Sequence, residues 1–134
     1  MSVSDIVDLL SVTFNDLLKF NKNIKIIATV SPIRHWKDGA HGNQLSKSVL
    51  LLAIDELLKT FDCLEYFPSY ELMLDDLRDY RYYDEDMIHL SNTAIDYIWE
   101  KFSLTYFTDQ TIELNNKIIQ INKSVNHKII DIKD

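Results

Sequence analysis

The fold is decided by Lys25-Ile26-Ile27-Ala28-Thr29-Val30-Ser31-Pro32, a short apolar and β-branched run that ends at a proline. Residues of this kind without polar alternation are typical of a strand that is buried on both faces, and the proline stops its ladder of hydrogen bonds. The run therefore predicts a strand over residues 25–30.

A second run, Cys63-Leu64-Glu65-Tyr66-Phe67, predicts another strand. Apolar residues recur at helical spacing between Leu45 and Leu58, which predicts a helix that reaches about Thr60. The order strand, helix, strand predicts two parallel strands joined by a right-handed crossover. We expect an α/β fold in which a short parallel sheet is flanked by helices.

Further helices are expected on either side of this unit. The first covers residues 4–20, with Ser2 or Ser4 as its N-cap. Others are capped by Ser69, running to about Leu77, by Ser91, and by Thr108-Asp109, so the C-terminal part is helical before a short apolar tail at 129–132. The expected inner face of the helix after Ser91 consists of Ala94, Ile95, Ile98, Trp99 and Phe102. The residues 31–44 and 79–88 are expected to be loops, and residues 1–134 to form a single domain.

The composition excludes several classes of function. With 134 residues, 46% of them hydrophobic, and a net charge of −7, the chain can build a core but offers no basic face to nucleic acid or to an anionic membrane. It contains no apolar run of membrane-spanning length and no secretory signal, so we expect a cytoplasmic protein. Cys63 is the only cysteine and is expected to be a buried, inert thiol. Two glycines cannot form a phosphate-binding loop, and no cofactor is expected.

Asp86 and His89 are the residues that most directly suggest chemistry. A carboxylate three residues before a histidine can fold back onto one imidazole nitrogen, which fixes the tautomer and leaves the other nitrogen as a base. Such a pair is two thirds of a catalytic triad. The alternative is an exposed loop pair whose spacing arose by chance. Residues 84–86 and His89 also offer oxygen and imidazole ligands for a metal ion, but clustered acids are more often a solvated face, here with Arg78 and Arg81 as partners, and no metal is expected.

The loop after the first strand carries Arg34 and His35, and it should lie near Asp86 and His89 because ligands bind at the carboxyl ends of parallel strands. We expect Arg34, His35, Tyr82 and Tyr83 to contact a substrate. In the alternative, His35 hydrogen-bonds to backbone and Arg34 pairs with an acid such as Asp38. The other histidines, His41 and His127, and Tyr80 are weaker candidates, whereas Trp99 and Phe102 are expected in the core.

Several ordered motifs give the chain a family resemblance. They begin with Thr29-Val30-Ser31-Pro32-Ile33-Arg34-His35, Lys37-Asp38-Gly39, Asn43-Gln44-Leu45-Ser46-Lys47-Ser48 and Leu50-Leu51-Leu52-Ala53-Ile54, and continue through Tyr66-Phe67-Pro68-Ser69-Tyr70-Glu71, Asp76-Leu77-Arg78-Asp79-Tyr80-Arg81, Glu85-Asp86-Met87-Ile88-His89 and Ala94-Ile95-Asp96-Tyr97-Ile98-Trp99. In these motifs, over most of residues 24–107, the sequence resembles the GSCFA family, which lies among or close to the SGNH (GDSL-type) hydrolases.

The resemblance implies a flavodoxin-like, three-layer hydrolase fold, here in partial form. It implies that Asp86 and His89 match the closing Asp-x-x-His block of a Ser-His-Asp triad. Two features depart from the family pattern: Leu90 follows His89 where a proline is usual, and the Gly-Ser-Cys-Phe-Ala block that would supply the nucleophilic serine is absent. The chain resembles the C-terminal part of the family domain.

Two functions follow as expectations. The first is the acid-base portion of an ester hydrolase, which acts on a small acyl or acetyl ester, sugar-linked in one version, once an N-terminal part supplies the serine. The second is a non-catalytic interaction or scaffold module, because an incomplete sheet exposes an edge through which the chain could self-associate.

Overall fold

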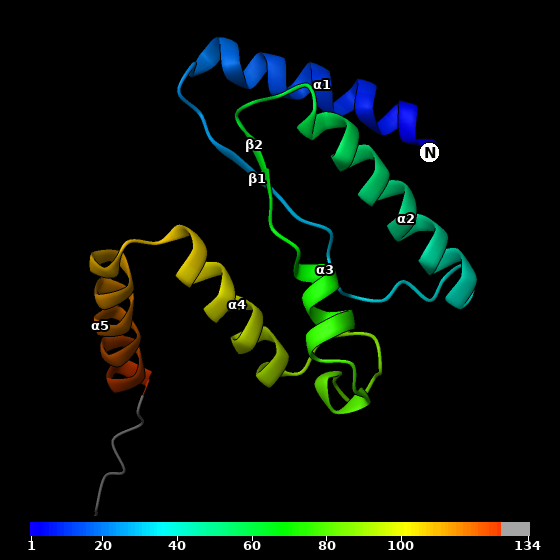
Figure 1. The fold of residues 1–134 in the computed structure, drawn as a ribbon. Coiled ribbons are helices and arrows are strands. Elements are labelled where there is room, and N and C mark those ends of the chain that lie inside the picture. The colour runs from blue at the N-terminus through cyan, green and yellow to red at the C-terminus, as the bar shows by residue number, and fades with distance from the viewer. Residues whose placement is uncertain (127–134) are drawn as a thin grey trace, which may run out of the picture. The chain divides into compact units, whose positions relative to one another are not determined.

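The structure is a computed structural model that describes residues 1–126 (Figure 1). These residues fall into two compact units, Met1–Ile98 and a second that begins at Trp99. The expected tail at residues 129–132 and His127 lie outside the described residues. None of the helices within residues 1–126 is both long enough and apolar enough to cross a lipid bilayer.

The first helix, α1 (Val3–Phe20), begins where the sequence predicts. The Ser2 hydroxyl accepts a hydrogen bond from the backbone N–H of Asp5 at 3.2 Å, and the Asp5 carboxylate accepts one from the backbone N–H of Ser2 at 2.7 Å. This reciprocal pair satisfies two backbone donors that the first helical turn cannot pair internally. The prediction of Ser2 as the N-cap is confirmed.

The predicted parallel pair of strands is confirmed, and both strands are short. β1 (Ile26–Ala28) pairs with β2 (Leu64–Tyr66) in the register Ile26 to Leu64 and Ala28 to Tyr66. β1 ends before Thr29 and Val30, where the side chain of Ser69 becomes a hydrogen-bond partner. Its hydroxyl lies 2.5 Å from the Thr29 hydroxyl and donates to the Val30 carbonyl oxygen at 2.9 Å.

The crossover helix, α2 (Gly39–Leu58), begins earlier than predicted. Residues 39–44 form its first turns, so the expected loop over 31–44 ends at Asp38. Gly39 has a φ of +73°, which closes the turn before the helix at low steric cost. A Cβ atom at Gly42 would lie 2.7 Å from the Asp38 Cβ, so a glycine lets the helix start close to this loop. Glycines are weak helix formers, and this is why the pattern suggested a loop.

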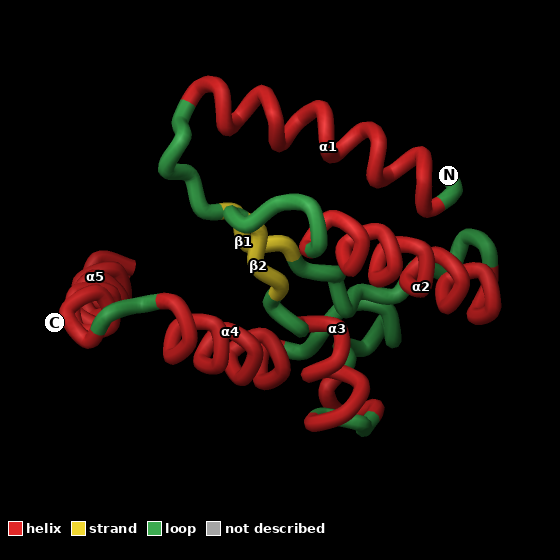
Figure 2. Tube along the Cα trace, turned by 45° about the horizontal axis from the view of Figure 1, so that its top comes forward, coloured by secondary structure: helices red, strands yellow, loops and turns green. Residues whose placement is uncertain are grey.

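α1 and α2 pack side by side on the sheet, as Figures 1 and 2 show. Phe14 of α1 and Leu57 of α2 share a buried cluster with Phe61 and Leu64, and the rings of Phe14 and Phe61 meet edge to face at 5.4 Å. Ile26 and Ala28 pack against the same cluster. Side chains alternate along a strand, so Ile27 points to the opposite face, where it is 40% exposed.

A short helix follows the sheet. α3 (Ser69–Glu71) continues into a π-helical turn over Leu72–Asp76, in which the Leu77 N–H reaches the Leu72 carbonyl oxygen at 3.2 Å. The prediction that Ser69 caps this helix is wrong. Ser69 is its first residue, and its buried hydroxyl binds the end of the first strand instead. The helix therefore starts where the sheet needs a hydrogen-bond donor.

α4 (Asn92–Tyr106) begins at the predicted cap, since the Ala94 N–H donates to the Ser91 hydroxyl at 3.4 Å. Ala94 is fully buried in a cluster with Met73, Leu77 and Leu90. The prediction of Ile95 as an inner residue is wrong, because Ala94 and Ile98 face this cluster and Ile95 is 51% exposed. The buried stripe of α4 runs through Ala94, Tyr97 and Ile98, which leaves Ile95 on its exposed side.

In the second unit, Trp99 stacks on Phe102 at 5.6 Å and meets Phe107 edge to face at 5.7 Å. Trp99 is nevertheless 51% exposed, so the prediction that it lies in the core is wrong, while Phe102 is half-buried. α5 (Asp109–Asn126) starts as predicted, with the Thr111 N–H donating to the Thr108 hydroxyl at 3.3 Å. The fold class is confirmed as mixed α/β: residues 1–126 form five α-helices and a two-stranded parallel sheet, and their C-terminal part is helical.

Candidate functional site

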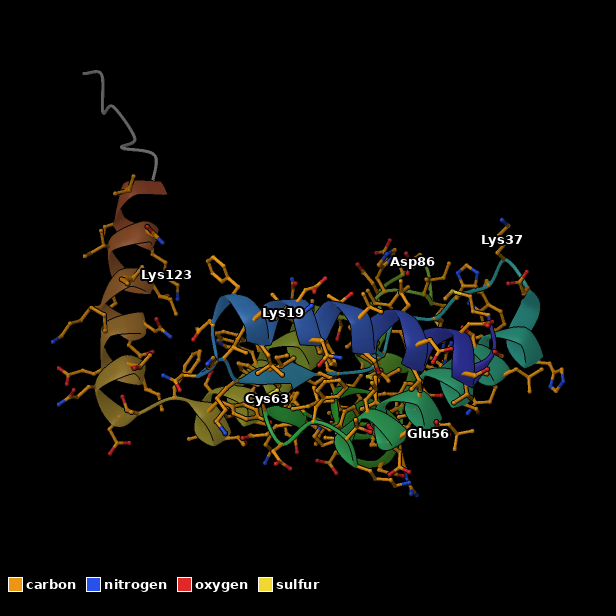
Figure 3. The ribbon with its side chains drawn as sticks, turned by 90° about the horizontal axis from the view of Figure 1, so that it is seen from above. Lys19, Lys37, Glu56, Cys63, Asp86 and Lys123 are labelled. Atoms are coloured by element: carbon orange, nitrogen blue, oxygen red, sulfur yellow. The ribbon has the colours of Figure 1, made fainter. Side chains whose placement is uncertain are left out.

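Asp86 and His89 are in direct contact. The Asp86 Oδ2 atom lies 2.5 Å from His89 Nδ1. The other carboxylate oxygen, Oδ1, accepts hydrogen bonds from the backbone N–H groups of Ile88 at 2.8 Å and His89 at 2.9 Å. The aspartate therefore orients both the backbone of the turn and the imidazole ring. Figure 3 shows Asp86 at the periphery of its unit, open to solvent.

The turn that carries this pair is closed by backbone hydrogen bonds. The Asp84 N–H donates to the His89 carbonyl oxygen at 2.9 Å, and the Met87 N–H donates to the Asp84 carbonyl oxygen at 2.9 Å. Met87 has a φ of +60°, a left-handed conformation that is uncommon for a residue with a side chain. A bridge between Tyr83 and Leu90 fixes the base of the turn, directly before α4.

The electrostatics of the turn favour a charged Asp86. The hydrogen bond from the His89 side chain, followed by those from the backbone N–H groups of His89 and Ile88, lowers the pKa of Asp86 to about 2. Asp86 is therefore a carboxylate at neutral pH and can only accept hydrogen bonds. The carboxylate therefore accepts a hydrogen bond from His89 Nδ1, and His89 Nε2 is the ring nitrogen that Asp86 does not engage.

The loop after β1 meets this turn, as predicted. The Arg34 backbone N–H donates to the Ile88 carbonyl oxygen at 3.1 Å, and Arg34 Nη1 donates to the Met87 carbonyl oxygen at 3.2 Å. The Arg34 guanidinium lies 3.8 Å from the centre of the Tyr83 ring, with the Tyr80 and Trp36 rings at 5.4 and 5.9 Å. Arg34 and Tyr83 thus lie beside the Asp86–His89 turn.

Comparison with known families identifies the group to which the sequence is related. Residues 1–102 match the GSCFA family. The chain belongs to the GSCFA family. The match covers the sheet, Arg34 and the whole Asp86–His89 turn, whereas α5 lies beyond it. No curated protein and no solved structure matches the chain significantly.

The other candidate residues, His35, Tyr82 and His41, lie in different surroundings. His35 is exposed, and its Nε2 atom lies 3.4 Å from Asp38 Oδ2, while its backbone N–H donates to Asn43 Oδ1 at 2.8 Å. The alternative pairing of Arg34 with Asp38 is therefore wrong, because His35 occupies that position. Tyr82 packs on the cluster around Met73. His41 is exposed in the first turn of α2.

The acids of the 84–86 segment are not paired with arginines in the expected way. Arg78 pairs with Asp75 at 3.3 Å, and Arg81 pairs with Asp79 at 3.0 Å. The prediction that these arginines neutralise the 84–86 segment is wrong, since each finds a nearer carboxylate in its own turn. Within residues 1–126, no three His, Cys, Asp or Glu side chains gather in a way that could hold a metal ion.

No serine in the described residues forms a hydrogen bond with His89. Three serines of this region have other partners. Ser31 accepts a hydrogen bond from the Ile33 N–H at 3.3 Å, Ser69 is buried at the end of β1, and Ser91 caps α4. Within residues 1–126, the side-chain hydrogen-bond partner of His89 is therefore Asp86 and not a serine.

Lys47 was not anticipated from the sequence. It is only 8% exposed, and its Nζ atom donates to the Ser31 carbonyl oxygen at 2.5 Å, with the Tyr70 ring 5.8 Å away. Burial lowers the pKa of the Lys47 amine. The signal was present in the helical spacing, because Lys47 lies seven residues before Ile54 and thus on the same inner face of α2. Through its bond to Ser31, Lys47 supports the loop that carries Arg34.

Proposed function

We propose that this chain carries the acid-base half of a serine ester hydrolase site of the SGNH type. The observation that supports this most directly is the 2.5 Å contact between Asp86 Oδ2 and His89 Nδ1, which sets the histidine up as a base through Nε2. The substrate would be a small acyl or acetyl ester, with a sugar-linked ester as one form. Family membership supports this assignment by analogy, and the residues of the turn support it by their chemistry.

In the proposed reaction, a serine from sequence outside residues 1–134 attacks the ester carbonyl. His89 Nε2 takes the serine hydroxyl proton as the new C–O bond forms, and it then returns this proton to the leaving alcohol. Water repeats the sequence on the acyl-enzyme and releases the carboxylic acid. Asp86 remains ionised throughout and stabilises the imidazolium that forms in each step.

A fluorophosphonate probe, combined with a chromogenic acetate ester, tests the proposal. We expect no adduct on residues 1–134 alone. A version extended at its N-terminus by a Gly-Ser-Cys-Phe-Ala-like block should be labelled on the serine of that block and should hydrolyse the ester. His89→Ala should abolish this activity, whereas His41→Ala, which removes an exposed histidine of α2, should retain it.

Two results would contradict the proposal. An adduct on a serine within residues 1–134 would disprove an external nucleophile. An extended version that is labelled and hydrolyses the ester equally well after His89→Ala would show that the histidine is not the base.

A second function, an interaction module, is favoured by a different observation. Within residues 1–126, β1 and β2 pair only with each other, which leaves an unpaired edge on each strand and a face where Ile27 is 40% exposed. If the chain self-associates through this sheet, Ile27→Lys should abolish a concentration-dependent dimer in light scattering. Val12→Lys replaces an exposed apolar residue of α1 instead and should leave the dimer intact.

A further inference from the structure

A small pocket is lined in part by Arg34, the residue that also contacts the Asp86–His89 turn. Its volume is about 260 Å³, and it is lined by Arg34, Met73, Leu74, Arg78, Asp79, Tyr80 and Tyr83. Met73 and Leu74 give it an apolar wall, whereas Arg34 joins it to the turn through the hydrogen bond to the Met87 carbonyl oxygen. Arg34 therefore lines the pocket and contacts the candidate active site.

The charges around the pocket leave one cation without an acidic partner. Asp79 is bound by Arg81 through both of its oxygens, at 3.0 and 3.2 Å, and Arg78 is paired with Asp75. Arg34 forms no ion pair with any carboxylate in residues 1–126. A half-buried guanidinium normally finds such a partner, because its charge is costly to remove from water.

The position of the guanidinium also determines which of its groups can bind a ligand. One face is covered by the Tyr83 ring at 3.8 Å, which stabilises the cation and holds its plane. One N–H of Nη1 is used by the Met87 carbonyl oxygen. The remaining N–H groups lie in the guanidinium plane, in the geometry that binds a carboxylate through two parallel hydrogen bonds.

Backbone strain marks the same place. The non-glycine residues with positive φ in the described chain are Met87 in the Asp86–His89 turn and Arg78 on the pocket wall, with φ values of +60° and +28°. Such conformations cost free energy and persist where surrounding structure fixes them, often at ligand sites. Here one flanks the candidate base and the other flanks the pocket.

We propose that this pocket binds a carboxylate on a short aliphatic part of the substrate, with Arg34 as the group that recognises it. The inference rests on the proposed function for its claim that the ligand is part of an ester substrate. A monoanionic carboxylate matches the single unpaired cation, and a short alkyl segment matches the wall formed by Met73 and Leu74. The substrate class becomes an acyl ester that carries a carboxylate away from the ester bond.

Binding of butyrate to the intact chain tests the inference without any hydrolysis, so its outcome is separate from that of the labelling experiment. We expect butyrate to shift the Arg34 Nε–Hε signal and the Tyr83 ring signals in NMR spectra, with a saturable dissociation constant in the millimolar range. Butyramide has the same size without the charge and should bind at least tenfold more weakly. Inorganic phosphate should also bind more weakly than butyrate.

Three variants locate the site. Arg34→Gln should weaken butyrate binding at least tenfold, whereas Lys37→Gln, which removes a charge whose side chain points outward from the same loop in Figure 3, should leave it unchanged. Leu74→Trp should block binding by filling the pocket while leaving Arg34 in place, which keeps the test valid if the Arg34 variant unfolds. Leu74 is 41% exposed, so a larger ring has room to settle.

Several outcomes would overturn the inference. Equal binding of butyramide and butyrate would show that no cation recognises the ligand. Tighter binding of phosphate would assign the pocket to a different anion. Loss of butyrate binding in His89→Ala but not in Arg34→Gln would place the carboxylate on the imidazole instead.

Discussion

Arg34 donates its backbone N–H to the carbonyl oxygen of Ile88 at 3.1 Å, so the loop after β1 is hydrogen-bonded to the turn that presents His89. The Arg34 side chain adds a second bond from Nη1 to the neighbouring Met87 carbonyl oxygen. Two segments more than fifty residues apart thus hold one another in place. The geometry of the Asp86–His89 pair depends on this connection as well as on its own turn.

Replacing the Arg34 guanidinium should therefore destabilise the first unit. We expect Arg34→Gln to lower the free energy of unfolding by about 1–2 kcal/mol, because it removes a cation–π contact and weakens a hydrogen bond from a charged donor at a partly exposed site. Urea denaturation monitored by tryptophan fluorescence measures this. Lys37→Gln makes the same charge change on the same loop and should alter stability by less than about 0.5 kcal/mol. An equal loss in both variants would refute the connection.

The hydrogen bonds to Asp86 predict a dependence of stability on acid. Because the pKa of Asp86 is lowered to about 2 in the folded chain, against about 3.9 in an unfolded one, the folded state binds fewer protons between these values. This contribution is complete above pH 4 and is lost as the pH falls from about 4 to 2. Urea unfolding over this range should show a shallower loss of stability in Asp86→Asn than in the wild type.

Asp8→Asn, which removes an exposed carboxylate of α1 that has none of these three hydrogen bonds, is the matched control. A ¹³C titration of the Asp86 carboxyl carbon measures the pKa directly. A midpoint at or above 3.9 would contradict the geometry of the turn.

These relationships show which parts of the molecule can be predicted from sequence. The Asp86–His89 contact was predictable because it joins residues three apart within a turn, where spacing and side-chain length alone define the geometry. The N-caps at Ser2 and Ser91 and the parallel strands were predictable for the same local or topological reasons. The position of Arg34 over Tyr83 was not, since it depends on how a loop and a distant turn pack.

The errors have physical causes as well. Ser69 looks like an N-cap by residue type. Its hydroxyl instead contacts the Thr29 hydroxyl and donates to the Val30 carbonyl oxygen at the end of the first strand. A lysine is normally expected in water, yet the position of Lys47 on the inner face of α2 lets its amine donate to the Ser31 carbonyl oxygen. In both cases a tertiary partner overrides the preference of the residue.

The role of Ser69 leads to a prediction about the end of the sheet. Ser69→Ala should lower the free energy of unfolding by about 1–3 kcal/mol, because it leaves the buried Val30 carbonyl oxygen without its donor. Ser46→Ala, at an exposed position of α2, should change stability by no more than about 0.5 kcal/mol. Thermal unfolding followed by circular dichroism distinguishes the two, and a Ser69→Ala protein as stable as the wild type would show that the hydroxyl is dispensable.

Lys47 offers a prediction at the opposite end of the pH scale. Burial lowers the pKa of its amine, so between that pKa and about 10.4 the unfolded chain binds more protons than the folded one. The contribution of Lys47 to stability should therefore rise with pH in this window.

Lys47→Met preserves the length of the side chain and removes the titrating group. The difference in unfolding free energy between wild type and Lys47→Met should therefore shift in favour of the wild type as the pH rises from 8 to 10. Lys47→Ala, which also opens a cavity under the Ser31 loop, should be about 2–3 kcal/mol less stable than Lys47→Met at every pH. A constant difference between the wild type and Lys47→Met across this range would mean that the amine is as well solvated in the folded chain as in the unfolded one.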